Sequence, residues 1–264
     1  MWHDVRSLNA ATNALLGLFA LVLLAAGLWW TAQRPMFTLR SIRIEGIDTA
    51  GAPVHLRHID PLTVRASAVR RIRGNFFTAN LDSVRQAFET VPWVRRATVR
   101  REWPNRLVVQ LEEHMPLGTW GDDGRLVSVK GEIFTANLAE AEEDAALAAF
   151  EGPDGSEKEL VARYQQMRDW FAPVNLAPEA LALSHRYAWS VRLNNGMRVE
   201  LGKEQGTATL QQRVDRFVKV YPRLITLLQD RIESVDMRYQ NGLALQASGL
   251  TLSTDKGTKK AKKQ

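Results

Sequence analysis

The sequence predicts an α+β protein held by a single N-terminal transmembrane helix. Three features lead to this fold class: a long uncharged apolar run near the N-terminus, short segments with the alternating pattern of half-buried strands, and longer segments with apolar residues at helical spacing. The body over residues 34–264 is long enough for one large domain or two modest ones.

The apolar run begins after Arg6 and ends before Arg34, and no residue between these two arginines carries a charge. Its centre reads ALLGLFALVLLAAGLWW, and a helix that spans a bilayer needs about 20 mostly apolar residues. We therefore expect a short tail over 1–12 and a transmembrane helix over 13–33. A cleaved signal peptide is the alternative, but the apolar core of such peptides is usually only about 7–15 residues long.

The charges that flank this run leave its orientation open. Arg34, Arg40 and Arg43 follow it, and by the positive-inside rule they favour a cytoplasmic body. Long domains, however, are translocated largely regardless of such charges, and the short first tail suits a cytoplasmic N-terminus.

The composition excludes several kinds of chemistry. The chain has no cysteine, so it has no disulfide, no thiolate metal site and no cysteine nucleophile. The formal net charge is +6 with a sequence pI near 9.8, and part of this charge lies in a lysine-rich tail over 250–264. We expect this tail to be disordered. It could bind anionic lipid or nucleic acid, but a solvated end that aids solubility is the favoured interpretation.

The first domain of the body is expected over 36–115. Its predicted elements are a strand over 37–47, a helix over 61–73 that Gly74 ends, a helix over 81–90 capped by Asn80, and strands over 94–102 and 107–113 joined by a turn at 103–105. The order strand, helix, helix, strand, strand predicts a three-stranded sheet with both helices on one face.

The second domain is expected over 116–249, as an antiparallel sheet with flanking helices. Its predicted elements are short strands around the Asp122-Asp123-Gly124 turn, a helix capped by Ser156 that runs to Phe171, a linker bounded by Pro173 and Pro178, strands over 183–193 and 197–201 around Asn194-Asn195-Gly196, a helix over 207–228 that Pro222 can kink, and strands over 232–239 and 243–247 around Gln240-Asn241-Gly242. The last strand precedes the tail, so we expect it at an edge of the sheet.

Motifs for catalysis or metal binding are absent from the sequence. His55 and His58 lie close together but have no acidic partner at metal-ligand spacing, and Glu112-Glu113 would point one carboxylate to each face of a strand. We therefore expect no cofactor, no metal and no enzymatic activity. An edge strand offers unpaired backbone groups to a partner strand, which favours a binding protein.

The most strongly charged element is the strand segment RRATVRR at 95–101. Nucleic-acid binding is one interpretation, but a basic surface for a protein or lipid partner suits an anchored protein better. Trp93, Trp103 and Trp120 are expected to pack in the core or against turns rather than to stack on bases.

The region 75–120 resembles the POTRA domain of the FtsQ/DivIB family of bacterial cell division proteins. The motifs that carry the resemblance are Pro92-Trp93-Val94, Val99-Arg100-Arg101, Trp103-Pro104, Leu107, Glu112 and Pro116. It continues through segments at 150–156, 189–196, 201–203, 216–222 and 235–245, and so covers essentially the whole chain. The resemblance implies a short cytoplasmic tail, one helix in the cell inner membrane and a periplasmic body of a POTRA domain and a β domain (single-pass, type II), located at the division septum.

This resemblance also implies a non-enzymatic scaffold that links early and late division proteins. Its implied partners are FtsB and FtsL, together with FtsW, FtsI, FtsK and FtsN; nucleic acid is not among them. FtsB would add a strand to the terminal edge of the β domain. By position, the FtsB site comprises Arg186, Arg238, Tyr239, Gly242, Leu243, Ala244, Leu245 and Ala247. Family members often carry a tryptophan where this chain has Ala247. A recruitment surface on the POTRA domain comprises Arg96, Val99 and Arg101.

Two other functions remain as alternatives. A membrane-anchored periplasmic enzyme acting on the cell wall would need a cleft with a perturbed carboxylate or histidine, for which the sequence offers no candidate. A POTRA-bearing outer-membrane transport protein would need a long C-terminal β-barrel, for which residues 34–264 leave no room.

Overall fold

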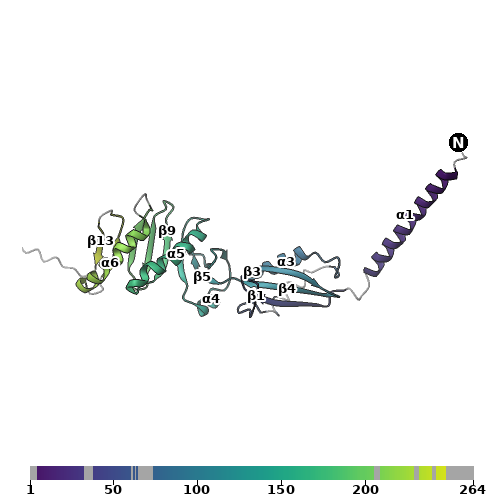
Figure 1. Ribbon diagram of the computed structural model, residues 1–264. Helices are drawn as coiled ribbons and strands as arrows, with labels where there is room; N and C mark the ends of the chain where they lie inside the picture. Colours follow the sequence, from purple (N-terminus) through teal and green to yellow (C-terminus); the bar gives the residue numbers. More distant parts are fainter. Residues whose placement is uncertain are drawn as a thin grey trace, which may run out of the picture. The chain divides into compact units, whose positions relative to one another are not determined.

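The computed structural model describes residues 5–32, 38–60, 62, 64, 74–204, 209–228, 232–239 and 242–247. The chain divides into two compact units, Met1–His114 and Met115–Gln264 (Figure 1). The helix expected over 61–73 is described only at Leu62 and Val64, and the tail over 250–264 lies outside the described residues.

The first unit begins with helix α1 (Val5–Ala32), which contains the apolar run. Its stretch Leu8–Trp30 has a mean hydropathy of 2.1, and by length and composition it could cross a membrane. All side chains over residues 8–30 are exposed in the isolated chain. A helix that is apolar all round and exposed along this stretch is suited to a lipid environment rather than to water.

The first unit also contains a four-stranded sheet, in the order β2-β1-β4-β3. Its strands are β1 (Ser41–Ile47), β2 (Pro53–Val54), β3 (Val94–Glu102) and β4 (Arg106–Glu113). The expected hairpin of β3 and β4 and the expected first strand are confirmed. The expectation of three strands is wrong, because the chain turns back at 48–51 and pairs β2 with Gly46 and Ile47.

Helix α3 (Leu81–Glu89) covers one face of this sheet and confirms the helix expected over 81–90. The side chain of Asn80 accepts hydrogen bonds from the backbone N–H groups of Asp82 and Ser83, as expected of an N-cap. Val84 and Phe88 are buried at helical spacing. Trp93 is also buried, in agreement with the sequence analysis, whereas Trp103 is 73% exposed, so its expected packing is wrong.

The second unit contains a nine-stranded sheet in the order β13-β12-β11-β10-β9-β8-β5-β6-β7. Its strands are β5 (Pro116–Trp120), β6 (Arg125–Ser128), β7 (Ile133–Phe134), β8 (Ala148–Glu151), β9 (Pro178–Leu183), β10 (Trp189–Leu193), β11 (Arg198–Gly202), β12 (Ile232–Asp236) and β13 (Ala244–Ala247). Its helices are α4 (Leu138–Asp144), α5 (Glu157–Phe171), the 3-10 turn η2 (Ala172–Val174) and α6 (Leu210–Leu228). The α+β class is thus confirmed.

This sheet is mixed, which corrects the antiparallel arrangement expected. The pairs β5–β8, β8–β9 and β11–β12 are parallel, and the others are antiparallel. A parallel pair needs a crossover connection, usually a helix. Helix α5 lies between β8 and β9 in the chain, and α6 lies between β11 and β12, so both predicted helices serve as crossovers.

Three local expectations differ from the structure. The single strand expected over 183–193 is two strands, because residues 184–188 form a turn in which the Ser184 hydroxyl accepts the backbone N–H of Ala188. Ser156 precedes α5 but makes no side-chain cap, since its hydroxyl donates to the carbonyl of Pro153. The expected linker contains η2, and Pro178 begins β9.

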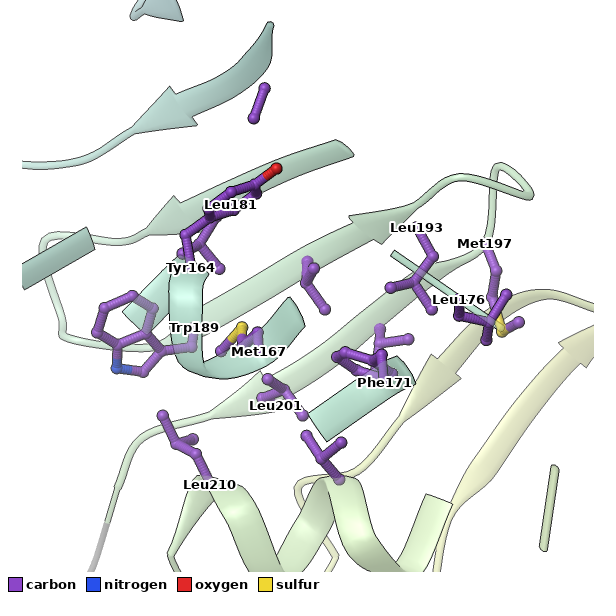
Figure 2. Packing of buried hydrophobic residues seen from close by; sticks show 14 of the residues in the cluster. Tyr164, Met167, Phe171, Leu176, Leu181, Trp189, Leu193, Met197, Leu201 and Leu210 are labelled. Carbon is purple, nitrogen blue, oxygen red and sulfur yellow. The ribbon is translucent and has the colours of Figure 1, made fainter. Parts of the chain in front are cut away.

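The core of the second unit lies between the sheet and helices α5 and α6 (Figure 2). Buried residues of α5, among them Met167 and Phe171, belong to the same cluster as Leu210 and Phe217 of α6. The cluster also takes alternate residues of β9, β10 and β11, so both helices cover the same face of the sheet. The helix expected over 207–228 is confirmed over Leu210–Leu228.

Candidate functional site

The terminal hairpin of β12 and β13 forms one end of the nine-stranded sheet. β13 pairs with β12 in antiparallel register, from Asp236 opposite Ala244 to Ile232 opposite Ala247. β12 pairs on its other side with β11, so it is an inner strand. In the described part of the chain no strand pairs with the outer side of β13. The sheet edge expected from the sequence is confirmed.

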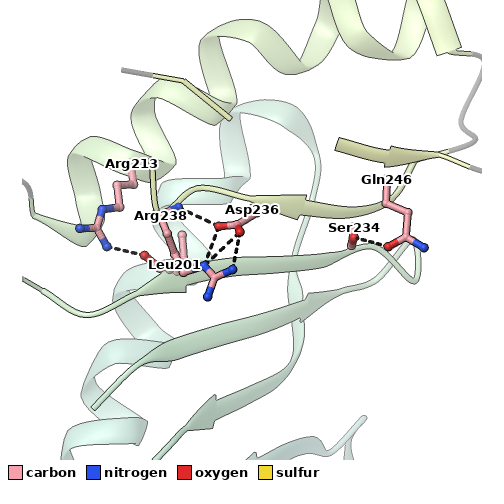
Figure 3. A network of polar contacts seen from close by, with 6 residues as sticks. All are labelled: Leu201, Arg213, Ser234, Asp236, Arg238 and Gln246. Carbon is pink, nitrogen blue, oxygen red and sulfur yellow. Dashed lines mark hydrogen bonds and ion pairs between the residues drawn. The ribbon is translucent and has the colours of Figure 1, made fainter. Parts of the chain in front are cut away.

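The side chains of β13 alternate between the two faces of the sheet. Leu245 and Ala247 are half-buried, and Leu245 packs against the core cluster together with Leu243. Ala244 and Gln246 are exposed on the other face, where the Ser234 hydroxyl contacts the Gln246 side-chain oxygen at 3.3 Å (Figure 3). A slip of one residue would turn Leu245 away from the core, so the packing of Leu245 fixes the register of β13 against β12.

An ion pair fixes the chain where β12 ends. Nε of Arg238 lies 2.9 Å and 3.0 Å from the two carboxylate oxygens of Asp236, and Nη2 lies 2.6 Å from Oδ2 (Figure 3). The backbone N–H of Arg238 also donates to Oδ1 of Asp236. The donated side-chain hydrogen bond is the main reason that the pKa of Asp236 is lowered. Most of the Arg238 side chain stays exposed, so the pair presents an oriented guanidinium to solvent.

Two arginines of α6 donate hydrogen bonds to backbone carbonyls at this end of the sheet. Arg216 donates to the carbonyl of Tyr239 at 3.1 Å and approaches that of Gly242 at 3.4 Å, and so ties both ends of the last turn to the helix. Arg213 is only 8% exposed and donates to the carbonyls of Leu201 and Lys203 at the end of β11. Sequence reasoning missed both arginines, because a basic residue on an amphipathic helix normally indicates a solvated face.

The predicted FtsB site residues lie mostly together. Arg238, Tyr239, Gly242 and Leu243 lie in the turn of the terminal hairpin, and Ala244, Leu245 and Ala247 lie on β13. Arg186 is exposed in the turn at 184–188, which connects β9 to β10. Ala188, two residues further along, lines a pocket of about 270 Å³ with Arg213 and Arg238, so the structure brings this turn to the same end of the sheet.

The residues of the second predicted surface lie on β3, the edge strand of the first sheet. Arg96 is exposed on one face, opposite Glu112, whereas Val99 is half-buried and pairs with Val109. Arg101 donates to the backbone carbonyls of Phe76 at 2.7 Å and Ala79 at 2.8 Å, so it secures the loop before α3. The three residues thus share a strand but not a face.

The two adjacent glutamates of β4 have separate structural partners. Glu112 is 6% exposed, accepts a hydrogen bond from the hydroxyl of Thr49 and pairs with Arg95 at 2.9 Å. Glu113 accepts the backbone N–H groups of Arg57 and of the next two residues. Among the residues that the structure describes, no group of three or more His, Cys, Asp or Glu side chains could hold a metal ion.

Comparison with protein families identifies both units. The model of the FtsQ-type POTRA domain matches residues 54–114, and the model of the C-terminal domain of cell division protein FtsQ/DivIB matches residues 118–238. The second match ends at residue 238, in the turn of the terminal hairpin.

Full-length relatives give the same answer. The chain is 53% identical over 263 residues to the cell division protein FtsQ of Burkholderia pseudomallei, with all of both chains covered. It is 41% identical to the FtsQ of Bordetella pertussis, over 93% of this chain and 92% of that one. It is 36% identical to the FtsQ of Nitrosospira multiformis, over 92% of this chain and 98% of that one. The chain belongs to the FtsQ/DivIB family of cell division proteins.

Proposed function

We propose that the chain is a non-enzymatic scaffold of the division machinery, which links early and late division proteins at the septum and binds the FtsB–FtsL pair. FtsW, FtsI, FtsK and FtsN are further partners by analogy with the family. The observation that carries this proposal is the position of β13 at the end of the nine-stranded sheet. Membership of a cell division family supplies the cellular process.

The topology that suits this role is that of an anchored periplasmic body. Residues 1–12 are the cytoplasmic tail, 13–33 cross the inner membrane, 36–115 form the POTRA domain, 116–249 form the β domain and 250–264 are the basic tail. Helix α1 supports this arrangement, because its exposed apolar surface is long enough for a bilayer. Anchoring confines the body to the membrane surface on which other anchored proteins diffuse, which raises their effective concentration.

FtsB binds, in this proposal, by adding a strand to β13. Alternate backbone N–H and C=O groups of a strand point to either side of it, so half of those on β13 point away from β12. These groups supply affinity that does not depend on sequence, and the side chains around them supply specificity. Tyr239, which is 58% exposed, and the oriented guanidinium of Arg238 stand at the turn where an incoming strand would begin or end.

Ala247 gives this site a feature of its own. It lies half-buried opposite Ile232, on the face of the sheet that is turned toward the core. A methyl group there leaves open the space that the tryptophan of other family members would fill. The partner strand in this system is therefore expected to carry a larger apolar side chain opposite Ala247.

The recruitment surface proposed on β3 involves fewer side chains than the sequence resemblance implies. Arg96 is exposed and available to an acidic partner, and the open edge of β3 lies beside it. Arg101 contributes by holding the loop before α3, since its guanidinium is engaged with backbone carbonyls.

Capture of FtsB–FtsL by the full chain in lipid nanodiscs tests the proposal. Stable co-elution of the pair with the loaded discs is expected, and its absence would contradict the scaffold function. A reporter fused after Gln264 tests the topology separately: activity in the periplasm is expected, and activity in the cytoplasm would contradict it. Turnover of peptidoglycan by the purified chain would favour the enzyme alternative instead.

A further inference from the structure

The end of the first sheet at which β1 begins carries exposed aromatic and basic side chains. We call this end the tip and define it by Arg40, Phe77, Arg100, Trp103 and Arg106. Trp103 is 73% exposed and Phe77 is 50% exposed. The three arginines are exposed as well. Large exposed aromatics beside basic residues are typical of binding surfaces rather than of solvated turns.

Hydrogen bonds and strand register place these residues at the same end of the sheet. The backbone N–H of Arg40 donates to the carbonyl of Asn105 at 3.1 Å, in the turn between β3 and β4. Ser41, the first residue of β1, pairs with Arg106. The guanidinium of Arg101 donates to the carbonyl of Phe76, which brings the loop with Phe77 to this end of β3.

The tip carries a net positive charge. Its only acidic neighbour on the β3–β4 turn is Glu102, which lies 3.9 Å from Arg100 and 4.0 Å from Arg106 at the outer limit of an ion pair. Three exposed arginines and one half-buried carboxylate leave an excess of two positive charges. An anionic surface is the complementary partner.

The length of the connecting chain fixes which surface lies within reach. Eight residue steps separate Ala32, the last residue of α1, from Arg40, and a fully extended chain spans at most about 3.6 Å per residue, or about 29 Å in total. The headgroup layer on each side of a bilayer is only about 5–7 Å thick. With α1 in the membrane, the tip cannot move further than this short tether from the lipid surface.

We propose that the tip binds the anionic phospholipid surface of the membrane that holds α1. The guanidinium groups of Arg40, Arg100 and Arg106 pair with headgroup phosphates, and the rings of Trp103 and Phe77 enter the headgroup layer, which aromatic side chains favour. This contact restricts the orientations of the POTRA domain, and it rests on the proposed anchoring by α1.

A fluorescent label on the tip tests this contact directly. Because the chain has no native cysteine, Asn105→Cys in the tip and Ala50→Cys in the β1–β2 turn at the opposite end of β1 each give a single labelling site. The full chain is placed in nanodiscs that contain phosphatidylglycerol or only phosphatidylcholine, with a headgroup-attached quencher on part of the lipid. We expect strong quenching at position 105 in phosphatidylglycerol discs, several-fold weaker quenching in phosphatidylcholine discs, and little quenching at position 50.

Charge variants separate the proposed contact from mere proximity. Removal of one arginine near an anionic surface weakens binding about fivefold, so Arg100→Gln with Arg106→Gln should abolish most of the quenching at position 105. The matched control is Lys219→Gln with Arg223→Gln, which removes two exposed charges from α6 and should leave quenching unchanged. Equal quenching at positions 105 and 50, or equal quenching in the two lipids, would overturn the proposal. Failure of the chain to co-elute with the discs would instead contradict the anchoring by α1.

Discussion

Replacement of Tyr239 by aspartate should remove most of the affinity for FtsB–FtsL without unfolding the chain. Tyr239 lies at the turn of the terminal hairpin, where 58% of its surface is exposed. Its backbone carbonyl accepts a hydrogen bond from Arg216, and a change of side chain leaves that bond in place. Substitutions at exposed positions without such contacts change stability by only about 0.5 kcal/mol or less.

The expected loss of affinity follows from the exposed area. A tyrosine buries about 200 Å² when fully covered, so a partner that covers the exposed part of Tyr239 buries about 115 Å². At about 25 cal/mol per Å² this is about 3 kcal/mol, which corresponds to about a 100-fold increase in Kd. The added carboxylate would enlarge this loss, because it must be desolvated in the complex.

The assay is titration of the nanodisc-embedded chain with purified FtsB–FtsL, read by biolayer interferometry. Met115→Asp is the matched control, since Met115 is 64% exposed and precedes β5 in the other half of the sheet. The control should bind as tightly as the wild type. A Tyr239→Asp variant that binds within about threefold of wild type, or a control that weakens equally, would refute the placement of FtsB at this turn.

Three further substitutions test the fold around both proposed surfaces. Phe217→Ala should lower the free energy of unfolding of the second unit by about 3–5 kcal/mol in urea titrations, because Phe217 is fully buried. A loss under about 1 kcal/mol would contradict the packing of α6. Glu112→Gln should destabilise the first unit by about 2–3 kcal/mol, because it removes the charge paired with the largely buried Arg95. An unchanged free energy of unfolding in urea would argue against this pair. The pKa of Asp236 is lowered mainly by the hydrogen bond from Arg238, so its stabilising effect should be complete above about pH 4 and be lost as the pH falls further. In the wild type, amide exchange of the Arg238 N–H should therefore speed up below pH 4 relative to the intrinsic exchange rate. The Asp236→Asn variant should not show this change, and equal pH profiles of exchange in the two proteins would contradict the pair.

Local features of the fold could be predicted because short segments encode them. Asn80 caps α3 through its own side chain, and the Asn194-Asn195-Gly196 turn joins β10 to β11. Alternation did not reveal the turn at 184–188, because the hydrogen bond that the Ser184 hydroxyl accepts from the Ala188 N–H does not change the alternation of polar and apolar residues. Parallel pairing of β8 with β9 was also missed, because it depends on the path of α5 across the sheet.

The candidate site was only partly predictable, because some of its contacts join segments that lie far apart in the sequence. The terminal position of β13 follows from its place before the tail and is confirmed by the sheet order. The support that Arg213 and Arg216 give to this edge depends on contacts between α6 and backbone carbonyls far from it in sequence. The exposure of Trp103 could not be inferred either, because a tryptophan beside a proline is equally consistent with a buried turn.

Amide hydrogen exchange of β13 tests strand addition most directly. Residues 244–247 should show protection that increases at least about tenfold for alternate amides when FtsB–FtsL binds, because those amides point away from β12 and become hydrogen-bonded to the added strand. Formation of a stable complex with unchanged exchange along β13, and with new protection confined to other parts of the chain, would contradict the central claim.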